Sequence, residues 1–242
     1  MARTRWLDRS YEVLGGRLPA PIAFLIAATF AASILAAQFH GVGETGVLVP
    51  GLVATGEVWR LVTWVLFQLD PVGLIFAALA LFWIGSALVG VWGPGRFLAT
   101  YFVIAAAGGL VTCLFALLLP RLRGAAFSGP WPIVDALIIA YAVYFPNRDI
   151  LVYFVLPLRG RNLIYATLAG TLIFALLSGD LSLFIPHFTA ELGTLAWLQG
   201  TPLGPLWARL KYEFAYRRWR RRASKLKAVP PPSPDEAPRW YH

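Results

Sequence analysis

Charged residues and cysteine are both scarce in this sequence. Only 14% of its 242 residues are charged, and it contains a single cysteine, Cys113. One cysteine excludes an intramolecular disulfide and any metal site built from paired cysteines. The low charge also argues against an ordinary soluble domain, in which about 25% of residues are charged.

Apolar residues, in contrast, make up 58% of the chain. Because such residues can face lipid without cost, we expect an integral membrane protein. A helix needs about 20 apolar residues to cross the hydrocarbon core. Six runs of roughly that length or somewhat shorter follow one another: Ile22–Phe39, Val72–Val91, Phe97–Leu119, Trp131–Phe145, Leu163–Leu177 and Leu181–Gln199. The composition and the runs together predict an all-α membrane bundle of six helices over residues 22–200.

The distribution of basic residues predicts the orientation. Six spans place both termini on one side, and that side then holds 18 of the 21 lysines and arginines. The other side holds Arg60, Arg121 and Arg123. Since cytoplasmic loops are enriched in these residues, we expect both termini in the cytoplasm and the protein in a bacterial inner membrane. The polar segment 1–21 has no A-x-A pattern after it, so the first run is expected to be retained.

Two connections contain apolar residues of their own. The stretch Gly41–Pro71 includes Trp59 and Trp64, so we expect this first loop to lie partly submerged against the bundle. The stretch Ile150–Leu158 is expected to lie at the membrane interface. In the sixth run, Pro186 is expected to bend the helix.

The C-terminal part divides into two segments. Residues 201–227 mix aromatic and basic side chains, which predicts an amphipathic helix on anionic lipid. A nucleic-acid arm is the alternative, but a basic patch beside a last span is more typical of a lipid anchor. Residues 228–242 are rich in proline and are expected to be disordered. Membrane lipids are therefore an expected partner, and neither nucleic acid nor a cofactor is.

Four segments, in order along the chain, carry a resemblance to a known family. They are Gly56-Glu57-Val58-Trp59-Arg60-Leu61-Val62-Thr63, then Gly85-Ser86-Ala87-Leu88 with Gly93-Pro94-Gly95-Arg96-Phe97-Leu98 and Tyr101, then Tyr141-Ala142-Val143-Tyr144-Phe145-Pro146-Asn147-Arg148, and Ala190-Glu191-Leu192-Gly193. Together they resemble the rhomboid intramembrane proteases. The resemblance implies a six-helix rhomboid-like bundle. We interpret Trp59 and Arg60 as structural residues that hold the first loop in place.

Rhomboids cut substrate helices with a serine and a histidine, and polar groups on the second span stabilise the oxyanion. When the family's motifs are placed on this chain, the serine falls on Trp131 and the histidine on Glu191. The family's histidine, asparagine and glutamate on the second span fall on Gly73, Ala77 and Val89. The resemblance therefore implies that all five polar positions are replaced.

A displaced dyad is the alternative. Ser128 and His187 each lie about one helical turn from the family's positions, on neighbouring spans. Ser128, however, stands before Gly129 and Pro130, which is equally typical of a loop or N-cap serine at the start of a helix.

Ionisable residues within the runs are candidates for function, because they are costly in lipid. Asp135 lies in the fourth run, and His187 and Glu191 in the sixth have the i and i+4 spacing that places them on one face. These three residues can form a buried polar cluster, in which Asp135 pairs with His187 or Glu191. A metal site would need further ligands, and beyond these residues only Asp180 is available, so no metal is expected.

Three functions remain open. The first is a rhomboid-like pseudoprotease that binds or escorts transmembrane helices of client proteins. The second is an active intramembrane serine endopeptidase that uses Ser128 and His187, and the third is a small proton-coupled carrier or channel. The replaced positions favour the first, and the sequence lacks the internal repeats typical of transporters.

Overall fold

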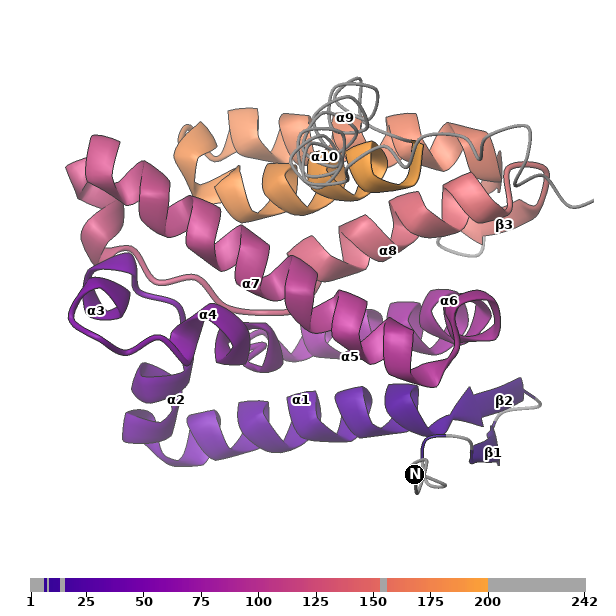
Figure 1. Ribbon diagram of the computed structural model, residues 1–242, viewed down its shortest axis with the longest axis horizontal. Helices are drawn as coiled ribbons and strands as arrows, with labels where there is room; N and C mark the ends of the chain where they lie inside the picture. The colour runs from indigo at the N-terminus through magenta and orange to yellow at the C-terminus, as the bar shows by residue number, and fades with distance from the viewer. Residues whose placement is uncertain (1–6, 8, 14–15, 153–155, 200–242) are drawn as a thin grey trace, which may run out of the picture. The chain divides into compact units, whose positions relative to one another are not determined.

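The protein folds as a bundle of helices with two short β-hairpins (Figure 1). The computed structural model describes residues 7, 9–13, 16–152 and 156–199. The predicted amphipathic helix at 201–227 and the predicted disordered tail at 228–242 lie outside the described residues.

Within this part of the chain, four helical segments are long and apolar enough to cross a membrane. They are α1 (Ala20–Gln38), the segment Pro71–Trp92, α7 (Pro94–Leu118) and α9 (Gly160–Leu177). Two further apolar helices, α8 (Trp131–Tyr144) and α10 (Ile185–Gln199), have 14 and 15 residues. All six predicted runs are thus helical. The count of six spans stays a prediction, since α8 and α10 are shorter than the bilayer core normally requires.

The segment Pro71–Trp92 contains an irregular turn. It consists of α5 (Pro71–Ala80), the π-helical turn η2 (Leu81–Gly85) and α6 (Ser86–Trp92). Asp70 caps its start by accepting a hydrogen bond from the backbone N–H of Gly73. Gly93, at φ 78°, makes the sharp turn into α7, a conformation that glycine adopts readily.

Two hairpins lie at one end of the bundle, the end at which α6 finishes (Figure 1). Strands β1 (Ser10–Val13) and β2 (Gly16–Pro19) pair antiparallel before α1, and β3 (Asp149–Val152) and β4 (Leu156–Arg159) pair antiparallel before α9. Sequence analysis did not predict them. Their strands pair backbone groups that lie outside the long helices. The stretch Ile150–Leu158, predicted to lie at the membrane interface, coincides with the second hairpin.

The sixth predicted run begins differently from expectation. A 3₁₀ turn, η4 (Leu181–Phe184), comes first, and α10 begins at Ile185 with Pro186 as its second residue. The prediction that Pro186 bends this helix is therefore wrong. Proline in a first turn removes no hydrogen bond that the helix would otherwise make, so it starts the helix without bending it.

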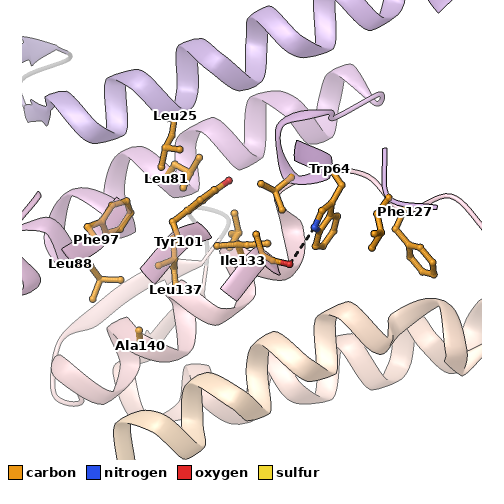
Figure 2. Close-up of a cluster of buried hydrophobic side chains, with 14 of the residues drawn as sticks. Leu25, Trp64, Leu81, Leu88, Phe97, Tyr101, Phe127, Ile133, Leu137 and Ala140 are labelled. Atoms are coloured by element: carbon orange, nitrogen blue, oxygen red, sulfur yellow. Dashed lines mark hydrogen bonds between the residues drawn. The ribbon is translucent and has the colours of Figure 1, made fainter. Parts of the chain in front are cut away.

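The hydrophobic core lies where α1, η2, α7 and α8 meet (Figure 2). Leu25, Leu81, Tyr101, Ile133 and Leu137 are all 1% exposed or less. In lipid these contacts act through close packing, because apolar side chains gain little by leaving an apolar solvent. The core therefore depends on shape complementarity between the helices.

The connection between α1 and α5 is itself folded onto the bundle. It consists of four short helical elements: α2 (His40–Gly46), α3 (Pro50–Ala54), α4 (Arg60–Thr63) and the 3₁₀ turn η1 (Trp64–Leu66). Both α3 and α4 pack against α7. The indole N–H of Trp64 also donates to the carbonyl of Ala105 at 3.3 Å, which ties η1 to α7 (Figure 2). That this loop is partly submerged in the membrane stays a prediction.

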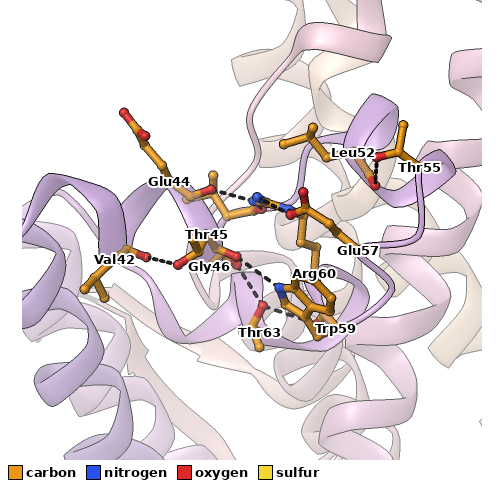
Figure 3. Close-up of polar contacts among 11 residues, drawn as sticks. Val42, Glu44, Thr45, Gly46, Leu52, Thr55, Glu57, Trp59, Arg60 and Thr63 are labelled. Carbon is orange, nitrogen blue, oxygen red and sulfur yellow. Dashed lines mark hydrogen bonds and ion pairs between the residues drawn. The ribbon is translucent and has the colours of Figure 1, made fainter.

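Arg60 organises this loop from within (Figure 3). Its side chain is 4% exposed, and its Nη1 donates to the carbonyls of Glu44 at 2.6 Å and Val47 at 2.7 Å. Its Nε donates to the carboxylate of Glu57 at 2.7 Å. One guanidinium thus donates hydrogen bonds to two backbone carbonyls, those of Glu44 and Val47, that would otherwise be unpaired. Trp59 beside it donates to the carbonyl of Thr45 at 3.3 Å.

We expect Arg60→Ala to lower the free energy of unfolding by about 2–4 kcal/mol, because it leaves a carboxylate and two carbonyls without their donor. The measurement is unfolding of the purified protein in mixed detergent micelles. Thr55→Ala is the matched control in the same loop, since it removes only the exposed local bond to Leu52. Equal losses in the two variants would contradict this role for Arg60.

Candidate functional site

Trp131 and Gly73 face each other between the start of α8 and the start of α5. A Cβ placed on Gly73 would lie 3.2 Å from the indole Nε1 of Trp131 and 2.6 Å from Asp70 Oδ2. The space beside Gly73 is therefore occupied, and a side chain there would displace its neighbours. The two positions that we predict to replace the family's serine and one of its oxyanion-stabilising residues thus lie in contact.

Gln68 also fills this space, and sequence analysis missed it. A Cβ on Gly73 would lie 2.5 Å from the side-chain nitrogen of Gln68, and a Cβ on Gly129 would collide with the side-chain oxygen. Gly129 has a φ of 99° and donates its N–H to the carbonyl of Trp64 at 3.0 Å. Gln68 therefore lies between two glycines from different elements. No spacing in the sequence indicates this, because the glycines are 56 positions apart in the numbering and meet only in the fold.

The other two positions that we predict to replace polar family residues are apolar and buried. Ala77 is 1% exposed and Val89 is 9% exposed. Ala77 lines a small apolar hollow between α1 and α5, together with Thr29, Leu74 and Pro130. Neither residue offers a hydrogen-bond donor for a developing negative charge.

Ser128 lies in the segment before α8. Its side chain is exposed, and in the part of the chain that the structure describes its hydroxyl makes no hydrogen bond. A serine nucleophile needs a base within hydrogen-bond reach. The structure does not join Ser128 and His187 by a hydrogen bond.

His187 instead pairs with Asp135 across α10 and α8. Its Nδ1 lies 2.7 Å from Asp135 Oδ2, and the two side chains are 22% and 17% exposed. In this geometry a neutral imidazole donates Nδ1–H to the carboxylate, which leaves Nε2 free of hydrogen bonds to the described residues. A carboxylate at Nδ1 also orients an imidazole to act as a base, as the aspartate does in a catalytic triad.

Glu191 lies deeper on the same helix and has a different partner. It is 0% exposed, and one carboxyl oxygen accepts a hydrogen bond from the hydroxyl of Thr171 on α9. Among the described residues its other oxygen and the hydroxyl of Thr194 have no partner. His187 and Glu191 are not hydrogen-bonded to each other. Asp135 and His187 therefore form a pair that joins α8 to α10, whereas Glu191 joins α10 to α9 through Thr171.

The contacts of Asp180 with Ser182 and Arg121, which we call the clamp, join two turns outside these helices. Asp180, in the turn between α9 and η4, accepts hydrogen bonds from the hydroxyl of Ser182 at 2.6 Å and its backbone N–H at 2.9 Å. It also lies 3.1 Å from Arg121 in η3 (Pro120–Gly124), the turn that follows α7. These bonds from Ser182, together with the charge of Arg121, lower the pKa of Asp180 below its usual value.

Comparison with known proteins identifies the fold. The family model of the Rhomboid domain matches residues 55–213, which is more than half of the chain. The chain therefore belongs to the rhomboid family, and with its long apolar helices it is an integral, multi-pass membrane protein. It is also 35% identical over 65 residues to "Rhomboid protease GluP" of Bacillus subtilis (strain 168), a match that covers 27% of this chain and 13% of that protein.

A double-mutant cycle measures the pairing of Asp135 with His187. We expect Asp135→Leu and His187→Leu to be coupled by about 0.5–1.5 kcal/mol in the free energy of unfolding, the size that double-mutant cycles give for an interhelical hydrogen bond in a membrane. Thr167→Val on α9 is the control partner for Asp135→Leu, since its hydroxyl bonds only to Leu163 within its own helix. Additivity in the His187 cycle would show that the pair contributes nothing.

The clamp predicts a dependence on pH. Because folding lowers the pKa of Asp180, its contribution is present above the unfolded-state pKa of about 3.9 and is lost as pH falls through the folded-state value. We expect residues 178–184 to exchange amide hydrogens faster in Asp180→Asn than in the wild type at neutral pH. The two proteins should converge in acid. A difference that stays constant down to the most acidic pH at which the bundle remains folded would contradict this assignment.

Proposed function

We propose that this protein is a rhomboid-like pseudoprotease that binds, and escorts, transmembrane helices of client membrane proteins. The observation that carries the proposal is the contact of Trp131 with the space beside Gly73, which Gln68 also fills. In a family member that cleaves peptide bonds, these positions hold the nucleophile and an oxyanion-stabilising group. Here they hold an indole, which cannot act as a nucleophile, and a hydrogen atom on carbon, which cannot donate a hydrogen bond to an oxyanion.

The lipid-facing helices offer a surface for a client. Only 22% of α9 is buried inside the protein, compared with 39% of α1. Ile173 and Phe174 on α9 are 55% and 66% exposed, and Val72 and Ile75 on α5 are 61% and 55% exposed. A helix that diffuses in the bilayer can pack against such faces without entering water. This supports binding from the side.

The orientation belongs to the same proposal. We place both termini in the cytoplasm of a bacterium and the protein in the inner membrane. The two hairpins lie at one end of the bundle, and the basic residues Arg9, Arg17 and Arg159 lie on or beside them (Figure 1). Arg121 and Arg123 lie in η3, at the other end of α7. The relative from Bacillus subtilis supports a bacterial membrane.

The rival function is that of an intramembrane serine endopeptidase built on Ser128 and His187. The hydrogen bond from His187 to Asp135 favours it, because a carboxylate at Nδ1 orients an imidazole for proton transfer at Nε2. The exposed Ser128, which has no hydrogen bond in the described structure, favours the proposal made here.

Labelling with a fluorophosphonate, which reacts only with activated serines, separates the two. We expect no labelling of the wild type under conditions in which an active rhomboid protease reacts. Ser128→Ala and His187→Ala are the controls: labelling of the wild type that is lost in both variants would establish the protease and overturn the proposal.

Client binding has its own readout. A photo-crosslinking amino acid at Ile173 should capture intact membrane-spanning proteins in cells, and one at Leu114, an equally lipid-exposed position on α7, should capture fewer. Equal capture at both positions would indicate random collision in the bilayer, contrary to a binding surface on α9.

A further inference from the structure

Three arginines meet where α8 ends and α9 begins, at the end of the bundle that carries the hairpins (Figure 1). The backbone N–H of Gly160 donates to the carbonyl of Arg148 at 2.9 Å. The backbone N–H of Arg161 donates to the carbonyl of Pro146 at 3.1 Å. These two bonds hold Arg148 beside the start of α9, where Arg159 and Arg161 flank Gly160. All three arginine side chains are exposed.

These residues, Arg148, Arg159 and Arg161, form what we call the arginine cluster, and its charge is not neutralised nearby. Within the described ranges, no ion pair involves any of the three. The segment 144–165 contains these three arginines and one acidic residue, Asp149, which leaves a net charge of +2. Since a guanidinium stays charged in proteins, the cluster attracts an anion. The ring of Phe145 orients one member, because the guanidinium carbon of Arg148 lies 4.8 Å from its centroid.

The neighbouring sequence places the cluster at the level of the lipid headgroups. Residues 150–158, which separate Arg148 from Arg159, include no charged residue. Tyr144 at the end of α8 is 41% exposed, and Tyr165 in the second turn of α9 is 73% exposed. Tyrosine favours the boundary between headgroups and acyl chains, and arginine extends from there into the headgroups.

One face of α9 continues from the cluster toward the middle of the membrane. Arg161, Tyr165 and Leu172 follow one another at intervals of four and seven residues, which places them on the same side of the helix. Leu172 is 47% exposed. From Arg161 to Leu172 the helix rises by about 16 Å, and half of the hydrocarbon core is about 15 Å thick. The face therefore presents, in order, a charged end, an interfacial ring and an aliphatic side chain over the depth of one leaflet.

We propose that the arginine cluster and this face of α9 bind an anionic phospholipid. Its phosphodiester headgroup pairs with the guanidinium groups, which donate two parallel N–H bonds to phosphate oxygens. One of its acyl chains lies along Tyr165 and Leu172. A free phosphate ion would use the arginines alone, whereas a lipid uses the whole face. Lipid binding here goes beyond the proposed function and does not depend on it.

The test places the photo-crosslinking residue benzoylphenylalanine at Tyr165 of the full-length protein in liposomes. The liposomes contain equal amounts of phosphatidylglycerol, which is anionic, and phosphatidylcholine, which is zwitterionic, with identical acyl chains. The mass of the irradiated protein shows which lipid has attached. We expect phosphatidylglycerol to exceed phosphatidylcholine by about fivefold or more, the effect of one basic residue near an anionic surface. The same probe at Leu177, 77% exposed at the other end of α9, should attach both lipids equally.

Substitutions assign the preference to the cluster. Arg148→Gln and Arg161→Gln should each lower the lipid ratio at Tyr165, and the double variant should bring it to the ratio at Leu177. Arg161→Lys should retain most of the preference, because it keeps the charge. Arg17→Gln is the matched control, since it removes an exposed arginine from the other hairpin at the same end of the bundle. Unchanged labelling at Leu177 shows that each variant is folded in the bilayer.

Three results would overturn the lipid site. The first is an equal lipid ratio at Tyr165 and Leu177 in the wild type. The second is a preference that survives the double substitution, or that Arg17→Gln lowers as much as Arg161→Gln, because the total charge of that end would then attract the lipid. The third is attachment of protein in place of lipid at Tyr165. Crosslinking of clients at Ile173 tests the proposed function separately.

Discussion

A polar group inside a bilayer has to find its partner within the protein, because lipid offers no hydrogen bonds. This constraint accounts for most of the polar contacts in the structure. Thr29, Thr112 and Thr167 each donate to the carbonyl four residues earlier in their own helices. The irregular backbone of the first loop, which a helix cannot satisfy, depends on the guanidinium of Arg60. Among the described residues, one carboxyl oxygen of Glu191 and the hydroxyl of Thr194 are buried exceptions to this rule.

The helices could be predicted from the sequence because lipid imposes length and composition together. Each apolar run contains a helix, and the boundaries differ by only a few residues, as for Ile22–Phe39 and α1. The hairpins were not predicted, since four-residue strands leave no periodicity that stands out from a loop. The start of α10 was missed because a proline can bend a helix or begin one, and the residues around Pro186 do not distinguish the two cases.

The candidate site was only partly visible in the sequence. Spacing identified Asp135, His187 and Glu191 as ionisable residues in apolar runs, but it left their partners open. The i and i+4 spacing favoured a contact between His187 and Glu191, whereas α8 and α9 each supply a nearer partner. Thr171 and Gln68 carried no signal, because a threonine or glutamine in the chain becomes informative only when the fold places it against a carboxyl group or a glycine.

The π-helical turn η2 has a consequence for the second span. An ordinary α-helix turns by about 100° per residue, so a single widened turn shifts the phase of all side chains beyond it. Gly73, before the turn, lies against Trp131, and Gly85, the last residue of the turn, lies against Ile22. The segment Pro71–Trp92 thus consists of two short helices, α5 and α6, and the turn η2 between them changes which side chains face the bundle. The side chains of α5 near Trp131 can therefore change in evolution without altering the face that α6 packs against α7.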